Sequence, residues 1–572
     1  MKNKIIYLLS ILPIVCLTSC RVTLIKSKTV ESSVYALFDG KVDSGRKIKY
    51  EVLEDKELLP YFSIDSYLSL YNNYLIDGYK ITTSNSRNGS TVFVTNKEDQ
   101  NLFVMAIDAT TKTIIENGEF SSAFNIAKDY SLSSLSLRSV NNYETAYEPI
   151  SIREFTYRNM DFKTFSKNGT VYYPLSLLEC VFSSYSGIRH LFNYSRIIQY
   201  ADYEELTDTT YKVGGNDVTA FKEMKEYINT SLKEMPLYLR EDRRASFLFT
   251  LENVYGLKFT RNISSMREYL EKQDFYNDFL SASALKRNEA FYKTFALLDD
   301  GHSSIRNHAD FPYEEGVFNQ YGPKVSRILS VRQTLSNQRT LAPGEVYYST
   351  DEKLAFFTFD SFTFAENAYK EDKRTLKDDL SDYHSVNYDT FFYFVKLLNE
   401  IKNKGGVKDV VIDISTNGGG TVGIMMKLIT LLAKTNNSAI YLRTDVTGMV
   451  QKMTTKVDSN GDGVYGDNDV FGNDFKIHIL TSEFSFSCGN AFPFFLKKNR
   501  IATIIGVKSG GGECAVGEAY LPSGEHYCHS SDLHIGWYEC DKFEGDEPGV
   551  EVDVSIDYAD FYNLDKLQTL IK

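Results

Sequence analysis

The 572-residue chain has few cysteines, a single tryptophan and a deficit of positive charge. Its 63 lysines and arginines are outnumbered by 76 aspartates and glutamates, and the net charge of −13 argues against nucleic acid or an anionic membrane surface as the main partner. Seven cysteines in so long a chain are too few for a disulfide-stabilised scaffold. The 42% apolar and 24% charged composition instead indicates a folded globular protein of about two to four domains.

Long apolar runs are absent beyond the N-terminus. Residues 1–20 start with a basic segment, and the apolar run that follows is too short to span a bilayer, which takes about 20 residues. It is typical of a secretory signal peptide. The segment ends in Leu-Thr-Ser-Cys, which resembles the bacterial lipobox. Cys20 is therefore expected to carry a lipid that anchors the protein to the cell envelope, facing the periplasm or the exterior. The alternative is an ordinary secretory signal with a coincidental cysteine.

The rest of the chain divides by composition into three parts. Residues 21–215 are rich in Tyr, Ser, Thr and Asn with short alternating runs, which predicts an α+β accessory module. Residues 218–310 follow a helical pattern that is expected to stop at Gly301. Across residues 345–572, buried strands such as 354–359 and 410–414 alternate with helices such as 389–404, which predicts a largely parallel sheet with crossover helices.

Three polar segments carry residues suited to acyl-transfer chemistry. The glycine-rich segment 413–420 follows a strand and precedes a helix, where free backbone N–H groups can bind an oxyanion. Segment 484–492 places serines between another strand and helix, and a helix start favours developing negative charge. Segment 297–304 offers a histidine as a base. A phosphate-binding P-loop is not expected, because no Lys-Ser/Thr pair follows the glycines.

Together these segments resemble the C-terminal processing (tail-specific) proteases and the tricorn-core serine peptidases. Five motifs of that family have counterparts in the same order, at 297–303, 413–420, 487–490, 506–509 and 549–553. The resemblance extends over roughly residues 240–560. It implies an α/β catalytic domain of the ClpP/crotonase-like fold, preceded by the helical segment and the N-terminal module. It also implies a peptide or protein as the partner.

The resemblance implies a nucleophile and a base. Ser487 matches the nucleophile, with Ser485 as the alternative. The lysine of Ser-Lys processing proteases would stand at Gly512, so that dyad is absent, and His302 matches the base of the tricorn branch instead. The implied reaction is attack of Ser487 on a peptide carbonyl, with His302 taking the proton and returning it to the leaving amine.

The same match implies the rest of the site. The N–H groups of Gly419 and Cys488 would form the oxyanion hole, and Asp546 or Glu547 would orient the histidine. No cofactor is expected for catalysis. The sequence also departs from the family pattern, with Asn490 in place of Glu, Ser415 in place of Arg and Val507 in place of Glu. These departures leave open a catalytically degenerate protein that binds a peptide or a lipid on the same fold.

A second motif, which has no part in the expected peptidase site, is a candidate calcium loop. Residues 458–469 match the twelve-residue calcium loop, with glycine at position 6 and aspartate at position 12. The expected ligands are Asp458, Asn460, Asp462, the Val464 carbonyl and Asp469. No apolar helices flank the loop, so a stabilising Ca²⁺ site within the catalytic domain is expected rather than a sensor. The alternative is a solvated polar turn.

Two smaller features concern the second half of the chain. Histidines and cysteines gather between residues 526 and 540, but their spacing matches no common zinc module. A Cys528–Cys540 disulfide or a hairpin is the favoured interpretation. Pro493 lies where the helix after Ser487 should already be running, so that helix is expected to start late or to kink.

Overall fold

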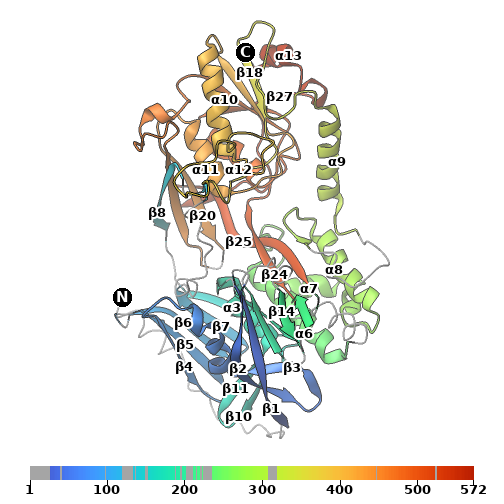
Figure 1. The fold of residues 1–572 in the computed structure, drawn as a ribbon. Coiled ribbons are helices and arrows are strands. Elements are labelled where there is room, and N and C mark those ends of the chain that lie inside the picture. The colour runs from blue at the N-terminus through green and yellow to red at the C-terminus, as the bar shows by residue number, and fades with distance from the viewer. Residues whose placement is uncertain are drawn as a thin grey trace.

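The computed structural model has two lobes, which Figure 1 shows one above the other. It describes residues 26–38, 41–96, 98, 100–118, 133–135, 137–147, 152–186, 188–193, 196–200, 210–213, 216–219, 222, 235–306, 319–445, 447–521 and 525–571. The signal segment 1–20 and Cys20 lie outside these residues. None of the helices in the described residues is both long enough and apolar enough to cross a bilayer.

The lower lobe is built on two sheets from the N-terminal part of the chain. The first has the order β10 (Phe165–Lys167), β11 (Thr170–Pro174), β3 (Lys56–Phe62), β2 (Lys41–Leu53), β1 (Ser27–Phe38), β13 (Arg196–Tyr200) and β12 (Arg189–Asn193). The second has the order β4 (Lys80–Asn85), β5 (Gly89–Thr95), β6 (Asn101–Asp108), β7 (Thr113–Gly118) and β9 (Ile152–Thr156). Helices α2 (Ile64–Leu68) and α3 (Leu175–Ser186) each follow a strand of the first sheet, and a short hairpin is formed by β14 (Thr210–Val213) and β15 (Asn216–Thr219).

The predicted helical segment is confirmed from Leu237 onward. It contains α6 (Leu237–Val254), α7 (Met266–Glu271) and α8 (Ala284–Leu298). The side chain of Ser265 caps α7 by accepting the N–H of Glu268. The predicted stop at Gly301 is wrong by two residues, because Asp299 ends α8 with a left-handed backbone at φ 45°. The start at 218 is wrong as well, since β15 covers residues 216–219.

The upper lobe contains the predicted parallel sheet. Its order is β17 (Tyr347–Tyr348), β18 (Leu354–Thr358), β19 (Asp409–Asp413), β22 (Lys476–Thr481), β23 (Ala502–Gly506) and β27 (Val554–Ser555). All neighbours from β18 to β27 are parallel, and only β17 runs antiparallel. The helices are α9 (Pro323–Gln338), α10 (Thr390–Lys404), α11 (Val422–Leu431), α12 (Cys488–Lys498) and α13 (Leu564–Leu570). The side chains between β18, β19, β22 and helices α10–α12 form the main apolar core.

Helix α12 corrects the expectation of a late start. It begins at Cys488, directly after Ser487, and continues through Pro493 to Lys498. Pro493 lies in the second turn, so the helix loses one interior hydrogen bond without losing its N-terminal turn. The helix therefore still presents its N-terminus beside the nucleophile candidate.

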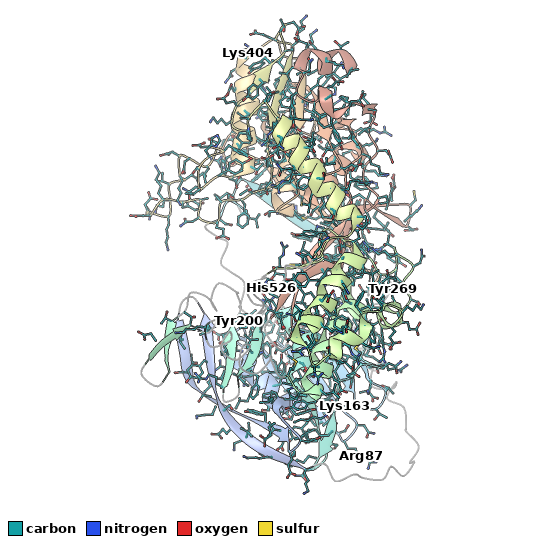
Figure 2. All side chains as sticks on the ribbon, turned by 90° about the vertical axis from the view of Figure 1, so that its right-hand side faces the viewer. Arg87, Lys163, Tyr200, Tyr269, Lys404 and His526 are labelled. Carbon is teal, nitrogen blue, oxygen red and sulfur yellow. The ribbon has the colours of Figure 1, made fainter. Side chains whose placement is uncertain are left out.

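An antiparallel sheet joins the two lobes. It contains β16 (Ser304–Ile305), β25 (His526–Glu539), β20 (Ser438–Thr444), β21 (Val450–Val457) and β8 (Ser139–Tyr147), with β24 (Cys514–Tyr520) and β26 (Lys542–Gly545) paired to β25. The long strand β25 begins at His526, which Figure 2 shows between the lobes, and runs toward the upper lobe, at whose far end Lys404 lies. Strand β8 pairs with β21, so part of the predicted module 21–215 belongs to a sheet of the C-terminal half.

The favoured disulfide is wrong. Cys180, Cys488, Cys514, Cys528 and Cys540 are all free. Cys528 lies near the start of β25 and Cys540 directly after its end, about 40 Å apart for an extended strand, which no disulfide can bridge. The hairpin alternative fits, since β25 turns into β26 at this point.

Candidate active site

Ser487 occupies a strained turn between β22 and α12. Its backbone has φ 56° and ψ −127°, a conformation that a residue with a side chain rarely adopts. Its N–H donates to the Gly511 carbonyl at 3.0 Å, and its partly exposed side chain makes no capping bond to α12. The strain therefore holds a serine hydroxyl away from the helix backbone at the carboxyl end of the parallel sheet. A strained strand-to-helix turn is how other serine hydrolases present a nucleophile.

The alternative nucleophile is not available. Ser485 is fully buried, and its Oγ donates to the Ile414 carbonyl at 2.8 Å while accepting the Ser482 N–H at 3.0 Å. The bond to Ile414 ties the β22–α12 turn to the end of β19, and the bond from Ser482 lies within the turn itself. Ser485 is thus a structural residue of the turn.

The glycine-rich loop 413–420 lies directly against Ser487. A Cβ added to Gly419, which has φ 112°, would come within 2.8 Å of the Ser487 Cβ and 3.1 Å of the Cys488 nitrogen, so only glycine fits. The Gly419 N–H donates to Asn417 Oδ1 at 2.9 Å and is therefore occupied within its own loop. Among the described residues, the Cys488 N–H has no hydrogen-bond partner. Of the two expected oxyanion donors, Cys488 is free in this structure and Gly419 is engaged.

His302 lies just after the end of α8, in contact with the residue that precedes the nucleophile. Its imidazole packs on the Phe486 ring with centroids 4.8 Å apart. The side chain is buried, and within the described part of the chain neither ring nitrogen has a hydrogen-bond partner, Ser487 included. Burial lowers the pKa of His302 below its usual 6.5, and the nearby Asp300 carboxylate opposes this shift. The ring is therefore neutral at neutral pH, as a general base must be.

The two carboxylates expected near His302 have different surroundings. Glu547 Oε2 accepts the N–H groups of Gly512 and Glu513 at 3.1 and 3.2 Å, and Oε1 pairs with Lys324 at 3.4 Å. Asp546 is only 3% exposed, and neither of its carboxylate oxygens has a partner among the described residues. Burial raises the pKa of Asp546 well above its usual range, and the charges of Glu513 and Glu547 raise it further. Neither carboxylate hydrogen-bonds to His302 in this structure.

Gly512, the position matched to the lysine of a Ser-Lys dyad, lies beside the Ser487 turn. A Cβ at this position, which has φ 97°, would lie 3.0 Å from the Ser487 nitrogen and 2.7 Å from the Phe486 ring. The position is therefore next to the nucleophile in space, where a lysine would have to stand. Lys508 cannot replace it, because its Nζ pairs with Glu551 at 2.6 Å on the surface.

A buried network behind this turn was not predicted as part of the site. Glu513 Oε2 accepts the Glu547 N–H at 3.1 Å, and Glu547 accepts the N–H groups of residues 512 and 513, so the two segments are joined by reciprocal hydrogen bonds. Glu513 Oε1 bonds His534 Nδ1 at 2.6 Å, and His534 Nε2 bonds Asp445 at 2.7 Å. Burial opposes protonation of His534, but its hydrogen bonds to Asp445, Cys514 and Glu513 raise its pKa to about 12. The only sequence signal was the Gly510–Gly512 run that precedes Glu513.

The calcium-loop residues form a tight turn. The Asp458 carboxylate accepts the N–H groups of Gly461 and Gly463, and Asp469 Oδ1 accepts those of Ser459 and Asn460. Asn460 and Asp462 each accept the N–H two residues on, at 2.8 and 2.7 Å. Arg138 pairs with Asp458 at 3.4 Å, and its guanidinium lies against Gly461.

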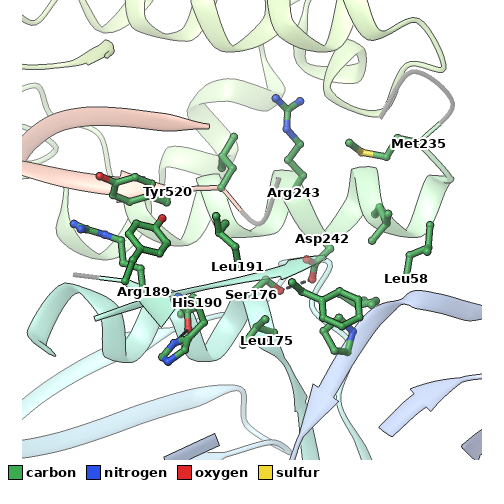
Figure 3. A pocket seen from close by; sticks show the side chains of 17 residues that line it. Leu58, Leu175, Ser176, Arg189, His190, Leu191, Met235, Asp242, Arg243 and Tyr520 are labelled. Atoms are coloured by element: carbon green, nitrogen blue, oxygen red, sulfur yellow. Dashed lines mark hydrogen bonds and ion pairs between the residues drawn. The ribbon is translucent and has the colours of Figure 1, made fainter. Parts of the chain in front are cut away.

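A separate cavity of about 60 Å³ lies in the lower lobe, between α3, α6 and the end of β24. Its walls are largely apolar and include Leu175, Leu191 and Met235, which Figure 3 shows around Asp242. Burial raises the pKa of Asp242 to about 7, although a hydrogen bond from Ser176 lowers it. None of the site residues described above lines this cavity.

Residues 382–535 match the model of peptidase family S41. This range contains Ser487 and the 413–420 loop, whereas His302 and Glu547 lie outside it. No curated protein matches the chain.

Three solved structures illustrate the similarity beyond the family match. The photosystem II D1 C-terminal processing protease is 15% identical over 38% of this chain and 45% of its own, with a TM-score of 0.25. Mature CPAF is 12% identical over 58% and 96%, with a TM-score of 0.36. The tricorn protease is 9% identical over 98% and 74%, with a TM-score of 0.35. The chain thus spans less than half the length of the D1 processing protease.

Proposed function

We propose that the chain is a serine endopeptidase with Ser487 as the nucleophile, on the basis that residues 382–535 match the model of peptidase family S41. The observation that supports this best is the strained backbone of Ser487, which presents the hydroxyl beside the free N–H of Cys488. A helix N-terminus and an unpaired N–H favour the negative charge that develops on a carbonyl oxygen under attack. Each such donor contributes about 10²–10³-fold to the rate in serine peptidases.

In the proposed mechanism His302 is the base. Ser487 Oγ attacks the peptide carbonyl carbon while a ring nitrogen of His302 takes the hydroxyl proton. The carbonyl oxygen becomes an oxyanion that accepts the Cys488 N–H, and His302 then delivers its proton to the leaving amine as the C–N bond breaks. Water attacks the resulting ester, again with His302 as base, and restores Ser487. His302 has to approach Ser487 Oγ from its place on Phe486 when substrate binds, as catalytic hydrogen bonds often tighten only in the complex.

Glu547 is proposed as the supporting carboxylate. Lys324, which lowers the pKa of His302, is paired with Glu547, so this carboxylate balances the nearest lysine charge around the base. It also holds the N–H groups of residues 512 and 513 beside Ser487. Asp546 is the alternative, because its buried carboxyl is uncommitted among the described residues.

The substrate is proposed to be a peptide or protein at the cell envelope. The Leu-Thr-Ser-Cys segment supports lipid anchoring through Cys20, with the membrane as a partner through the lipid only. Replacing Cys20 with Ser should then release the protein from the membrane fraction without changing its catalytic domain. Retention of Cys20→Ser in the membrane fraction would contradict the anchor.

A stabilising Ca²⁺ ion is proposed for the 458–469 loop. The donor set is oxygen only, which suits Ca²⁺, and a Val464 carbonyl completes the expected ligands Asp458, Asn460, Asp462 and Asp469. Arg138 is the one residue that opposes this fit, since its guanidinium already neutralises Asp458. The ion would therefore have to displace Arg138 from that carboxylate.

Hydrolysis of casein by the wild type and by single variants tests the peptidase proposal. Ser487→Ala and His302→Ala should each lose activity by about 10³-fold or more, whereas a folded Ser485→Ala should retain most of it. Unchanged activity of Ser487→Ala would contradict the assignment. A wild type that binds casein peptides without cleaving them would instead support the catalytically degenerate binding protein.

A further inference from the structure

Three buried side chains beside the proposed active site form a compact cluster of metal-binding types. Glu513 and Cys514 stand at the start of β24, and His534 lies opposite Cys514 on β25. His534 Nδ1 lies 2.6 Å from Glu513 Oε1 and 3.7 Å from Cys514 Sγ, and the three donor atoms all lie within 4.8 Å of one another. Zinc–sulfur and zinc–nitrogen bonds of about 2.3 and 2.0 Å at a tetrahedral angle place sulfur and nitrogen about 3.5 Å apart. The Cys514–His534 separation already fits that requirement.

The surroundings of His534 also fit a metal ligand. Its other nitrogen, Nε2, bonds Asp445 at 2.7 Å, and Arg443 holds Asp445 at 2.6 Å. A histidine that binds a metal usually donates its second N–H to a carboxylate, which fixes the ring and strengthens the ligand. The ring of His534 is therefore already oriented with Nδ1 toward Glu513 and Cys514.

A further buried group is left without a partner close to this cluster. The Asp546 carboxyl has no hydrogen-bond partner among the described residues, and Glu513 is the charge that acts on it most strongly. A buried polar group of this kind normally finds a partner, an ordered water or an ion.

A second cluster in the same hairpin lacks these features. Glu518, His526 and Cys528 also bring three donor atoms within 4.8 Å. Arg306 donates to Cys528 Sγ at 2.7 Å, and Arg189 pairs with Glu518 at 3.8 Å. Two of the three possible ligands are therefore already bound by arginine side chains. No comparable arginine contacts Glu513, Cys514 or His534 among the described residues.

We propose that Glu513, Cys514 and His534 supply three of the four ligands of a buried zinc ion. Sulfur, imidazole and carboxylate together suit Zn²⁺ better than Ca²⁺ or Mg²⁺. Binding releases the Cys514 thiol proton and the His534 Nδ1 proton to solvent, while Asp445 keeps the Nε2 proton. The ion would lock β24 to β25 and fix Glu513, which in turn holds Glu547 beside the Ser487 turn.

Metal analysis of the purified full chain tests this proposal. After dialysis against zinc and then against metal-free buffer, the wild type should retain one equivalent of zinc, and cobalt substitution should give a thiolate-to-cobalt charge-transfer band. Cys514→Ser should lose the band and most of the zinc, and His534→Gln should bind at least tenfold more weakly. Cys528→Ser is the matched control and should retain both.

A wild type with no zinc and no cobalt band would overturn the proposal, even if the Cys514 variant failed to fold. A band that persists in Cys514→Ser and disappears in Cys528→Ser would move the site to the second cluster. Because zinc content and the cobalt spectrum need no catalysis, Ser487→Ala should bind as the wild type does. The result is therefore independent of the proposed peptidase activity.

Discussion

The imidazole of His302 lies on the phenyl ring of Phe486, with centroids 4.8 Å apart, and Phe486 directly precedes Ser487. Gly301 makes this contact possible, since a Cβ there would come within 2.6 Å of the same ring. The proposed base is thereby held one residue from the proposed nucleophile, and its nitrogens are left without partners among the described residues. The arrangement keeps His302 neutral and ready to receive a proton once substrate brings Ser487 Oγ within reach.

The first prediction concerns the pH dependence of this base. Burial lowers the pKa of His302 below 6.5, so reactivity of Ser487 should be constant above pH 6.5 and fall as the pH drops further. Asp300 raises the pKa of His302, so Asp300→Asn should move this acid limb to lower pH. The rate of inactivation by a fluorophosphonate, measured from pH 4 to 8, checks both points without a known substrate. A limb that moves to higher pH in Asp300→Asn would contradict the assignment of His302.

The second prediction concerns the glycine beside the nucleophile. Gly512→Ala forces a Cβ against the Ser487 nitrogen and the Phe486 ring at a φ of 97°, and should destabilise the fold by about 2–4 kcal/mol. Gly406→Ala is the control, because its φ of 82° carries the same backbone strain with nothing within 4 Å, and should cost only about 1 kcal/mol. Urea denaturation measures both, and equal costs would show that Gly512 does not contact the nucleophile turn.

Local signals explain which parts of the fold could be predicted. Asp389 caps α10 by accepting the N–H groups of Phe391 and Phe392, and Gly405 ends the helix with φ 71°. Both residues are adjacent in sequence to the element they limit, so the expected helix over 389–404 is confirmed almost to the residue. The strands at 354–359 and 410–414 are confirmed for the same reason, because a buried parallel strand is a short continuous apolar run.

Long-range pairing explains what could not be predicted. Strand β8 is largely exposed and carries no apolar pattern that would indicate β21, more than 300 residues later, as its partner. Glu513 hydrogen-bonds to Glu547 and, through His534, is linked to Asp445. This network forms only where segments far apart in the sequence meet in the fold. The proposed roles of Ser487 and His302 rest on the order of the sequence motifs. The structural role of Ser485 became visible only from its buried hydrogen bonds.

The third prediction concerns the 458–469 loop. Calcium at a hundredfold excess over its dissociation constant should stabilise the fold by about 2.7 kcal/mol, so EGTA should lower the melting temperature. Asp458→Ala should abolish this dependence. Arg138→Gln removes the guanidinium that competes for Asp458 and should bind Ca²⁺ more tightly than the wild type. Melting temperatures that do not respond to Ca²⁺ in the wild type or in Arg138→Gln would identify the loop as a polar turn.

The fourth prediction concerns acid stability. His529 is buried, and burial lowers its pKa to about 4, so the unfolded chain binds a proton at this residue before the folded chain does. Its contribution is fully present above pH 6.5 and is lost as the pH falls from 6.5 to 4, by about 3 kcal/mol at most. In His529→Gln the free energy of unfolding should therefore vary less between pH 7 and pH 4. An unchanged difference between these two pH values would place the acid sensitivity at other groups.

The most direct measurement is the position of a covalent fluorophosphonate adduct. The wild-type protein should gain one adduct, and peptide mapping by mass spectrometry should place it on Ser487. Ser487→Ala should gain none, whereas a folded Ser485→Ala should still be modified at Ser487. An adduct on another serine, or equal modification of the wild type and Ser487→Ala, would contradict the account of Ser487 as the nucleophile.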